Sequence, residues 1–374
     1  MAVPLSLVDS LRDVLAGFGP MVQGARGRLV GRRVLASRSA LVPTVLAALE
    51  AARLVPALDW TVHEARWSDT GVALVPIGPP GEPARLIVKF ADPGPALDAL
   101  RAQEDRLARL HTDPRLADWA TIVPRVLHTG FVDAVPYFVE TALAGIPATQ
   151  LFGEARLRQR LLPIAAEAIA GLHERTATPA RVDDVVLDDW VEAPIRAIAT
   201  ALEGRRGGGR ETRGALEGLG RELRAWLAGR EASIGWIHGD YWPGNILVAP
   251  DGSRISGIVD WDLASDGQLA LHDPIHLVLL TRRLVSGGEL GDIVRGLLAG
   301  DPLEPAERSA LAAAGLRPST WERDAREAVL LVWLRHVGFF ALIPSEGSNP
   351  RWVRRNVMAV LDALPRRRRI GGAQ

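Results

Sequence analysis

Residues 238–245 read HGDYWPGN, and residues 258–262 read IVDWD. In the first segment the carboxylate of Asp240 precedes the amide of Asn245 by five residues on a turn-rich stretch. Apolar runs on either side of an Asp251-Gly252 turn then predict a β-hairpin, and Asp260 follows its second run. We therefore expect Asp240, Asn245 and Asp260 to converge at one end of this hairpin.

This set of oxygen atoms suits phosphoryl-transfer chemistry. Mg²⁺ prefers hard oxygen ligands from carboxylates and amides, so Asn245 and Asp260 are candidate metal ligands. Asp240 is then available to accept a proton from a hydroxyl nucleophile. In the alternative interpretation His238 and Asp240 cap a turn and Asn245 holds the loop, but the hairpin and the later Asp260 favour the chemical one.

Lys89 is the sole lysine of the chain, whose other basic residues are all arginine. Strand-like runs at 60–66, 72–77 and 85–90 predict a meander that ends on Lys89. The stretch 96–110 predicts a helix in which Glu104 interrupts an apolar face. Because a buried charge needs a partner, we predict a Lys89–Glu104 ion pair. The alternative is an exposed Glu104 beside a shifted apolar stripe.

Together these motifs resemble those of the aminoglycoside phosphotransferase family, in the wider group of small-molecule kinases that includes choline kinase. The resemblance covers about Trp60 to His276. It implies a catalytic loop with Asp240 as base and His238 at its start, and Mg²⁺ on Asn245 and Asp260. It also implies that Lys89 and Glu104 form the ion pair that serves the nucleotide phosphates.

The same resemblance assigns further nucleotide contacts, for ATP or GTP. FVETAL at 138–143 matches the hinge that meets adenine, with Glu140 and Ala142 as candidates. The turn WSDTG at 67–71 lacks the glycines of a G-x-G-x-x-G loop, so Ser68 and Thr70 are expected to contact the phosphates. Asp273 matches the Asp that supports the catalytic loop, although a plain helix cap is the alternative.

Three more side chains are candidates for the acceptor site. Trp242 could stack on a substrate or pack in the core. Asp262 and Asp266 could bind a cationic substrate, or they could be solvated carboxylates.

The fold predicted from these patterns is α+β with two lobes. Residues 1–50 form a helical extension, residues 51–143 a small lobe with an antiparallel sheet, and residues 144–374 a helical lobe with the catalytic loop and acceptor site. The resemblance implies a protein-kinase-like arrangement with the nucleotide between the lobes.

We expect an ATP-dependent phosphotransferase that moves the γ-phosphoryl group to a hydroxyl of a small molecule. An aminoglycoside-like antibiotic, a sugar, an amino alcohol or a biosynthetic intermediate would fit. A non-catalytic nucleotide-binding scaffold is an alternative, but the residues expected to be lost from one are all present. A kinase acting on protein is a second alternative, disfavoured because the segment LALHDP follows Asp260 too soon for a long activation loop.

The composition limits the partners, the chemistry and the cellular location that we expect for this chain. The 44 basic and 44 acidic residues cancel, which disfavours nucleic acid as a partner. The absence of cysteine excludes disulfides and thiolate chemistry. The N-terminus lacks the basic start of a secretory signal, and the longest apolar runs are too short to span a membrane, so we expect a soluble cytoplasmic protein.

Overall fold

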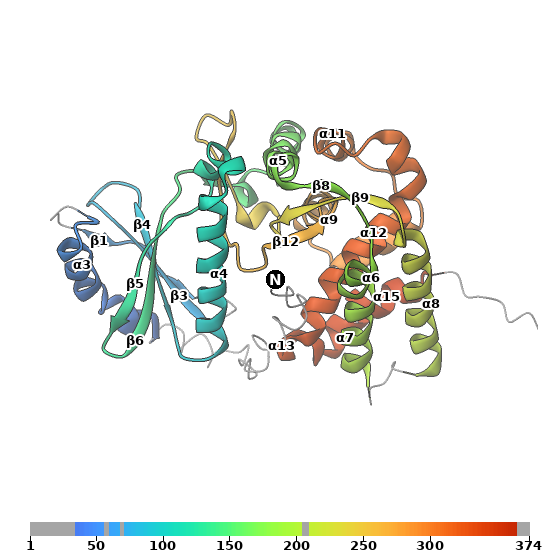
Figure 1. The fold of residues 1–374 in the computed structure, drawn as a ribbon, viewed down its shortest axis with the longest axis horizontal. Coiled ribbons are helices and arrows are strands. Elements are labelled where there is room, and N and C mark those ends of the chain that lie inside the picture. The colour runs from blue at the N-terminus through green and yellow to red at the C-terminus, as the bar shows by residue number, and fades with distance from the viewer. Residues whose placement is uncertain (1–33, 56–59, 68–70, 204–208, 365–374) are drawn as a thin grey trace, which may run out of the picture.

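The computed structural model describes residues 34–55, 60–67, 71–203 and 209–364. Its described part has two lobes, a small one built on an antiparallel sheet and a larger one that is mostly helical (Figure 1). Strand β6 leads out of the small lobe, and the chain enters the larger lobe at the short strand β7 (Ile146–Pro147). The predicted α+β, two-lobed fold is confirmed.

The small lobe contains a six-stranded sheet in the order β1-β3-β4-β6-β5, with β2 also paired to β3. Both short strands pair with β3, so the first strand of the predicted meander is split in two. The strands are β1 (Thr61–Val62), β2 (Arg66–Trp67), β3 (Val72–Gly78), β4 (Leu86–Ala91), β5 (Val126–Val132) and β6 (Val135–Thr141).

Helix α3 (Val42–Ala51) covers one face of this sheet, and helix α4 (Pro95–Thr112) covers the other. Side chains alternate along a strand, so Val88 and Phe90 of β4 join the core under α3, while Ala91 joins the core under α4. Lys89 shares the α4 side, since it bonds a residue of that helix. In Figure 1, α4 stands between the sheet and the larger lobe.

One helical stretch in the described part, Val34–Ala51, is long and apolar enough to cross a membrane by length and composition alone. The apolar side chains of its second half, α3, pack against the sheet of the small lobe. Val42, Val45 and Leu49 are buried in the core that α3 shares with the sheet.

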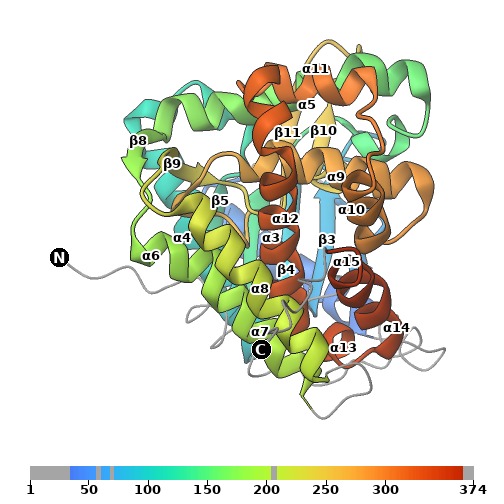
Figure 2. The ribbon, with the colours of Figure 1, turned by 90° about the vertical axis from the view of Figure 1, so that its right-hand side faces the viewer.

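The larger lobe is organised around α12 (Pro318–Leu342), whose segment 328–334 is buried on all sides. Figure 2 shows α12 beside α7 and α8. The other helices are α5 (Ala155–Thr176), α6 (Asp184–Leu187), α7 (Ala193–Leu202), α8 (Arg210–Leu227), α9 (His272–Ser286), α10 (Leu290–Leu298), α11 (Pro305–Ala313), α13 (Pro344–Gly347), α14 (Pro350–Val353) and α15 (Ala359–Leu361).

Single helical turns connect these elements. The 3₁₀ turns are η1 (Pro114–Leu116), η2 (Trp119–Ile122), η3 (Ala148–Gln150) and η5 (Pro243–Asn245), and the π-helical turns are η4 (Asp188–Glu192) and η6 (Arg354–Met358).

Two three-stranded sheets frame the catalytic segment of the larger lobe. The predicted hairpin is present as β10 (Ile246–Val248) and β11 (Ile255–Ile258), with β7 on its other edge. A second sheet, of β8 (Thr178–Arg181), β9 (Glu231–Ile237) and β12 (Ser265–Leu269), was not predicted. Strand β9 ends where the HGDYWPGN segment begins, so the sheet holds one end of that segment and the hairpin holds the other.

Candidate active site

The loop that carries Asp240 is shaped by Gly239, which has a φ of 82°. A side chain at this position would be strained, and its Cβ would also collide with the backbone carbonyl of Leu263. Glycine therefore allows the loop to pack closely against the segment after β11.

Asp273, which is fully buried on α9, fixes the backbone of this loop by hydrogen bonds. Its carboxylate accepts hydrogen bonds from the backbone N–H groups of His238 (2.8 Å) and Gly239 (3.0 Å). It also bonds the rings of His173 on α5 (3.0 Å) and His272 (3.3 Å). Burial alone would raise the pKa of Asp273, but the hydrogen bonds from the two histidines hold it well below its usual range. A plain helix cap would not bond the catalytic loop, so the geometry favours the supporting role.

We expect Asp273→Asn to lower the free energy of unfolding by about 2–4 kcal/mol, because a buried anion that accepts several hydrogen bonds is lost. The pKa of Asp273 is lower in the folded state, so its contribution is complete above about pH 4, the unfolded value. It declines as the pH falls below that value. Denaturant unfolding at several pH values checks this, with Asp118→Asn, at an exposed site, as control. An equal effect of both substitutions would contradict the assignment.

His238 is also fully buried, and it acts through the backbone around it. Its Nε2 lies 3.0 Å from the Val259 carbonyl and therefore carries the proton. Its Nδ1 then accepts the backbone N–H of Asp240 at 3.3 Å. Burial lowers the pKa of His238, which keeps the ring neutral. The ring thus links the β11 end to the Asp240 loop, which makes His238 a positioning residue in this geometry.

Asp240 and Asn245 are in direct contact, as the motif predicted. The Asn245 amide nitrogen donates to the backbone carbonyl of Asp240 (2.9 Å) and to its carboxylate (3.1 Å). Burial, followed by the nearby charge of Asp260, raises the pKa of Asp240 to about 7. Asp260 follows β11 with a φ of 67° and is exposed. The three predicted side chains are therefore brought together.

A divalent cation fits this donor set. The Asn245 nitrogen is committed to Asp240, so its amide oxygen is the atom that would ligate a metal. Burial, followed by the charges of Asp260 and Asp240, raises the pKa of Asp262 as well, so three carboxylates share one region with an excess of negative charge. Hard oxygen atoms and excess negative charge are the environment that Mg²⁺ requires.

Lys89 is buried and paired, but not with the predicted partner. Its Nζ lies 2.9 Å from a carboxylate oxygen of Glu140 on β6 and 3.1 Å from the side-chain oxygen of Gln103 on α4. Residues 87 and 140 are opposite each other in the sheet, so Lys89 and Glu140 are diagonal neighbours on one face. The predicted Lys89–Glu104 pair is wrong.

The error comes from one position on α4. The buried side of the helix contains Leu100, Gln103 and Leu107, whereas Glu104 is partly exposed. Successive helical residues are rotated by about 100°, and both positions 103 and 104 fit between Leu100 and Leu107 at i+3 or i+4 spacing. Burial and the nearby charge of Asp105 raise the pKa of Glu104. Its carboxylate does not form the ion pair with Lys89, which Glu140 provides.

Glu140→Gln and Glu104→Gln form a matched pair of variants. We expect Glu140→Gln to lower kcat about 10- to 100-fold, because the buried ammonium loses its counter-charge and its position. Glu104→Gln should stay within about twofold of the native value, as surface changes usually do. Steady-state kinetics with ATP varied decides between the partners, and the opposite ranking would restore Glu104 as the functional one.

The predicted hinge has a backbone hydrogen bond of its own, which competes with a bond to adenine. The backbone N–H of Ala142 donates to the Arg85 carbonyl at 2.8 Å, so this donor is engaged inside the small lobe. The Glu140 side chain turns to Lys89. Adenine contacts of Glu140 and Ala142 remain predictions. Ser68 and Thr70 lie outside the described residues.

The three acceptor candidates have different locations. Charges of Arg106 and Lys89 act on Asp262, which places it towards the small lobe. Asp266 pairs with Arg109 of α4 at 3.3 Å on the surface. Trp242 packs against the core of the larger lobe.

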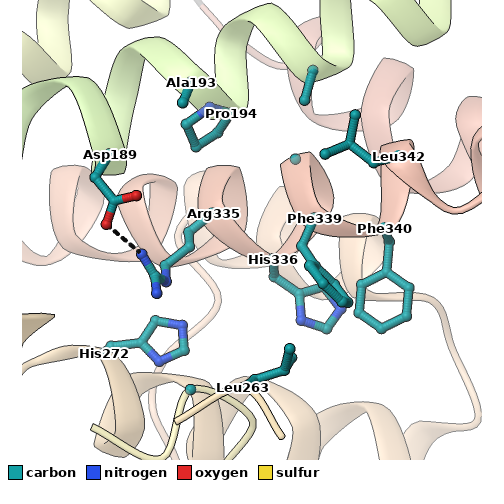
Figure 3. A pocket seen from close by; sticks show the side chains of 13 residues that line it. Asp189, Ala193, Pro194, Leu263, His272, Arg335, His336, Phe339, Phe340 and Leu342 are labelled. Atoms are coloured by element: carbon teal, nitrogen blue, oxygen red, sulfur yellow. Dashed lines mark hydrogen bonds and ion pairs between the residues drawn. The ribbon is translucent and has the colours of Figure 1, made fainter. Parts of the chain in front are cut away.

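A cavity opens beside the catalytic loop (Figure 3). Gly239 and Leu263 form one wall, and His336, Phe339 and Phe340 of α12 form another. Trp242, Asp262 and Asp266 do not line it. Most of its lining comes from 183–215 and 315–360, the segments of the larger lobe in which the sequence places acceptor specificity, but the sequence has no signature that singles out these side chains.

The fold and this site define a small-molecule kinase with a protein-kinase-like architecture. The model of the phosphotransferase enzyme family matches residues 59–325. The chain belongs to this family. It is accordingly an enzyme that transfers the γ-phosphoryl group of ATP to a hydroxyl of a small molecule.

Individual relatives are more distant. An aminoglycoside 3'-phosphotransferase of Streptomyces fradiae is 26% identical over 227 residues, which are 56% of this chain and 75% of that protein. The structure of aminoglycoside phosphotransferase APH(3'')-Id from Streptomyces rimosus aligns over 78% of this chain and 97% of its own, with 20% identity and a TM-score of 0.47. The ADP-bound aminoglycoside phosphotransferase APH(2'')-Ib aligns over 84% of this chain and 95% of its own, with 12% identity and a TM-score of 0.49.

Proposed function

We propose that Asp240 is the residue that orients and deprotonates the acceptor hydroxyl, with Asn245 and Asp260 holding Mg²⁺ and Lys89 contacting the nucleotide phosphates. The observation that supports this proposal is the contact between Asn245 and Asp240, next to Asp260 and beside a cavity. When bound, the ion supplies neutralisation of the phosphate charge.

In this proposal the small lobe binds the nucleotide phosphates through Lys89, and the larger lobe binds the acceptor hydroxyl through Asp240. Lys89, fixed by Glu140 and Gln103, would direct its ammonium group from the small lobe towards the phosphate oxygens nearer the base, those of the α- and β-phosphates. Asp240 accepts the hydroxyl proton as the acceptor oxygen attacks phosphorus and the bond to the ADP oxygen breaks. A pKa raised to about 7 makes its carboxylate more basic than an ordinary Asp, which suits this task.

The acceptor belongs to the hydroxylated small molecules. The relative from Streptomyces fradiae is an aminoglycoside phosphotransferase, and another structure in the comparison is a glucosamine kinase, so antibiotics and sugars are both reasonable acceptors to test. We also propose a cytoplasmic location, supported by the chain's lack of cysteine, which suits a reducing compartment.

The test is a phosphorylation screen with purified protein, ATP and Mg²⁺. Acceptors should include streptomycin, glucosamine, amino alcohols and neutral polyols. Nucleotide consumption identifies hits, and mass spectrometry must then show a monophosphorylated acceptor. A product that forms equally well without Mg²⁺ would contradict the metal assignment, and ATP hydrolysis with no phosphorylated acceptor would contradict the acceptor role of Asp240.

A further inference from the structure

The cavity lies next to the proposed base, Asp240, which is not itself one of its lining residues. Gly239, which lines it, immediately precedes Asp240. A ring nitrogen of His336, another lining residue, lies within 4.8 Å of both the Asp240 carboxylate and His276. His276 bonds His336 at 3.0 Å, so this wall is held in place. This end of the cavity is therefore adjacent to Asp240.

The side chains that line the cavity carry no net charge. Its lining includes one carboxylate, Asp189, and one guanidinium, Arg335, which face each other at 3.5 Å (Figure 3). Arg335 also lies over the Trp190 ring at 4.2 Å. Burial lowers the pKa of His272 and lowers that of His336 to about 3, so both rings are neutral. An ammonium group placed here would meet a carboxylate that already has a counter-ion.

The rest of the lining is mainly apolar. Phe339, Phe340 and Leu342 extend from the end of α12, and Ala193 and Pro194 face them from α7. Desolvating a charge against such a surface is unfavourable, whereas covering it with apolar groups is favourable. This lining selects against highly charged ligands.

One polar atom of the cavity wall lacks a partner. Asp189 is 7% exposed, and its Oδ1 accepts no hydrogen bond from the described residues. Its Oδ2 faces Arg335. A buried acceptor without a donor is costly, so a ligand hydroxyl that donates to Oδ1 would be stabilised.

We propose that the acceptor of this enzyme is a neutral, largely apolar alcohol with a second hydroxyl group that donates to Asp189. This inference rests on the proposed function, since it assigns the acceptor to this cavity. One hydroxyl is placed at Asp240 for phosphorylation, the apolar body packs against Phe339 and Phe340, and the second hydroxyl satisfies Asp189. A polycationic acceptor does not match this lining.

The test uses three small probes of one shape. 1,4-Benzenedimethanol is neutral, with a hydroxyl at each end of an apolar ring. 4-(Aminomethyl)benzyl alcohol replaces one hydroxyl by an ammonium group, and 4-methylbenzyl alcohol lacks the second polar group. Binding to the protein with Mg²⁺ and ADP is measured by ligand-observed NMR titration. We expect the diol to bind about tenfold more tightly than the ammonium analogue and about threefold to tenfold more tightly than the mono-alcohol.

Two phenylalanine variants locate the binding. Phe340→Ala should weaken diol binding about tenfold, because the lost ring is part of the apolar wall. Phe131→Ala, at a ring that is 69% exposed in the small lobe, should leave it unchanged. The probe series on the native protein decides the question even if Phe340→Ala does not fold. Absence of diol binding, equal or tighter binding of the ammonium analogue, or an unchanged Phe340→Ala affinity would overturn the proposal.

A transfer assay separates this inference from the proposed function. If the diol binds as expected but the screen yields no phosphorylated acceptor, the cavity assignment stands and the proposed function fails. If a cationic acceptor is phosphorylated in preference to every neutral one, the proposed function stands and the assignment of acceptor class fails.

Discussion

Asp240→Asn is expected to lower the single-turnover rate by about 10²–10⁴-fold, while affinity for Mg²⁺-nucleotide stays within about threefold of native. The amide keeps the size of the side chain and its contact with Asn245 but cannot accept the hydroxyl proton. A loose phosphoryl-transfer transition state needs little proton transfer, so misorientation of the acceptor accounts for much of the loss. Calorimetric titration and rapid-quench transfer on one preparation measure both quantities.

Asp266→Asn is the matched control, because this carboxylate follows the same hairpin but pairs with Arg109 outside the cavity. Its turnover should remain native. Native turnover in Asp240→Asn would mean that Asp240 only caps the loop. Loss of both nucleotide binding and turnover would mean that it is a structural residue or a metal ligand, and that Asp260 needs a new role.

Lys89→Arg should reduce kcat/KM for ATP by about 10²-fold or more, nearly as much as Lys89→Ala. The ammonium fits between Glu140 and Gln103 in a buried space, and a planar, larger guanidinium must move at least one of them. Misplacement of about 1 Å at a reacting group is enough for a loss of this size.

Arg101→Lys, a basic exchange at an exposed position of α4, is the control and should have native kinetics. Circular dichroism must show that the Lys89 variants fold. If Lys89→Arg supports transfer at close to the native rate, the chain's single lysine is not required by the chemistry.

The parts of the site that lie close together in the sequence could be predicted well. Asp240, Asn245 and Asp260 belong to one loop and the hairpin that follows it, so their convergence depends on local turns and one strand pairing. The strand that carries Lys89 was also predictable, because alternation and turn residues mark it.

What could not be predicted depends on contacts between distant elements. The apolar pattern of α4 fits Gln103 and Glu104 equally well, and only packing against the sheet buries one of them. A signal for Glu140 does exist, since this acidic residue interrupts the apolar strand FVE, but the hinge motif explains the same position by its backbone. Nothing local joins Asp189 to Arg335, which meet when η4 packs on α12.

The anchoring of Lys89 has a mechanical consequence. Its two partners, Glu140 and Gln103, both belong to the small lobe, so the ammonium is aligned there whatever the position of the larger lobe. Glu140 also sits near the end of β6, the strand that continues into the connection between the lobes. A rotation about that connection would therefore carry Lys89 and both of its partners together with the small lobe, so the lysine keeps its alignment while the distance to the larger lobe changes.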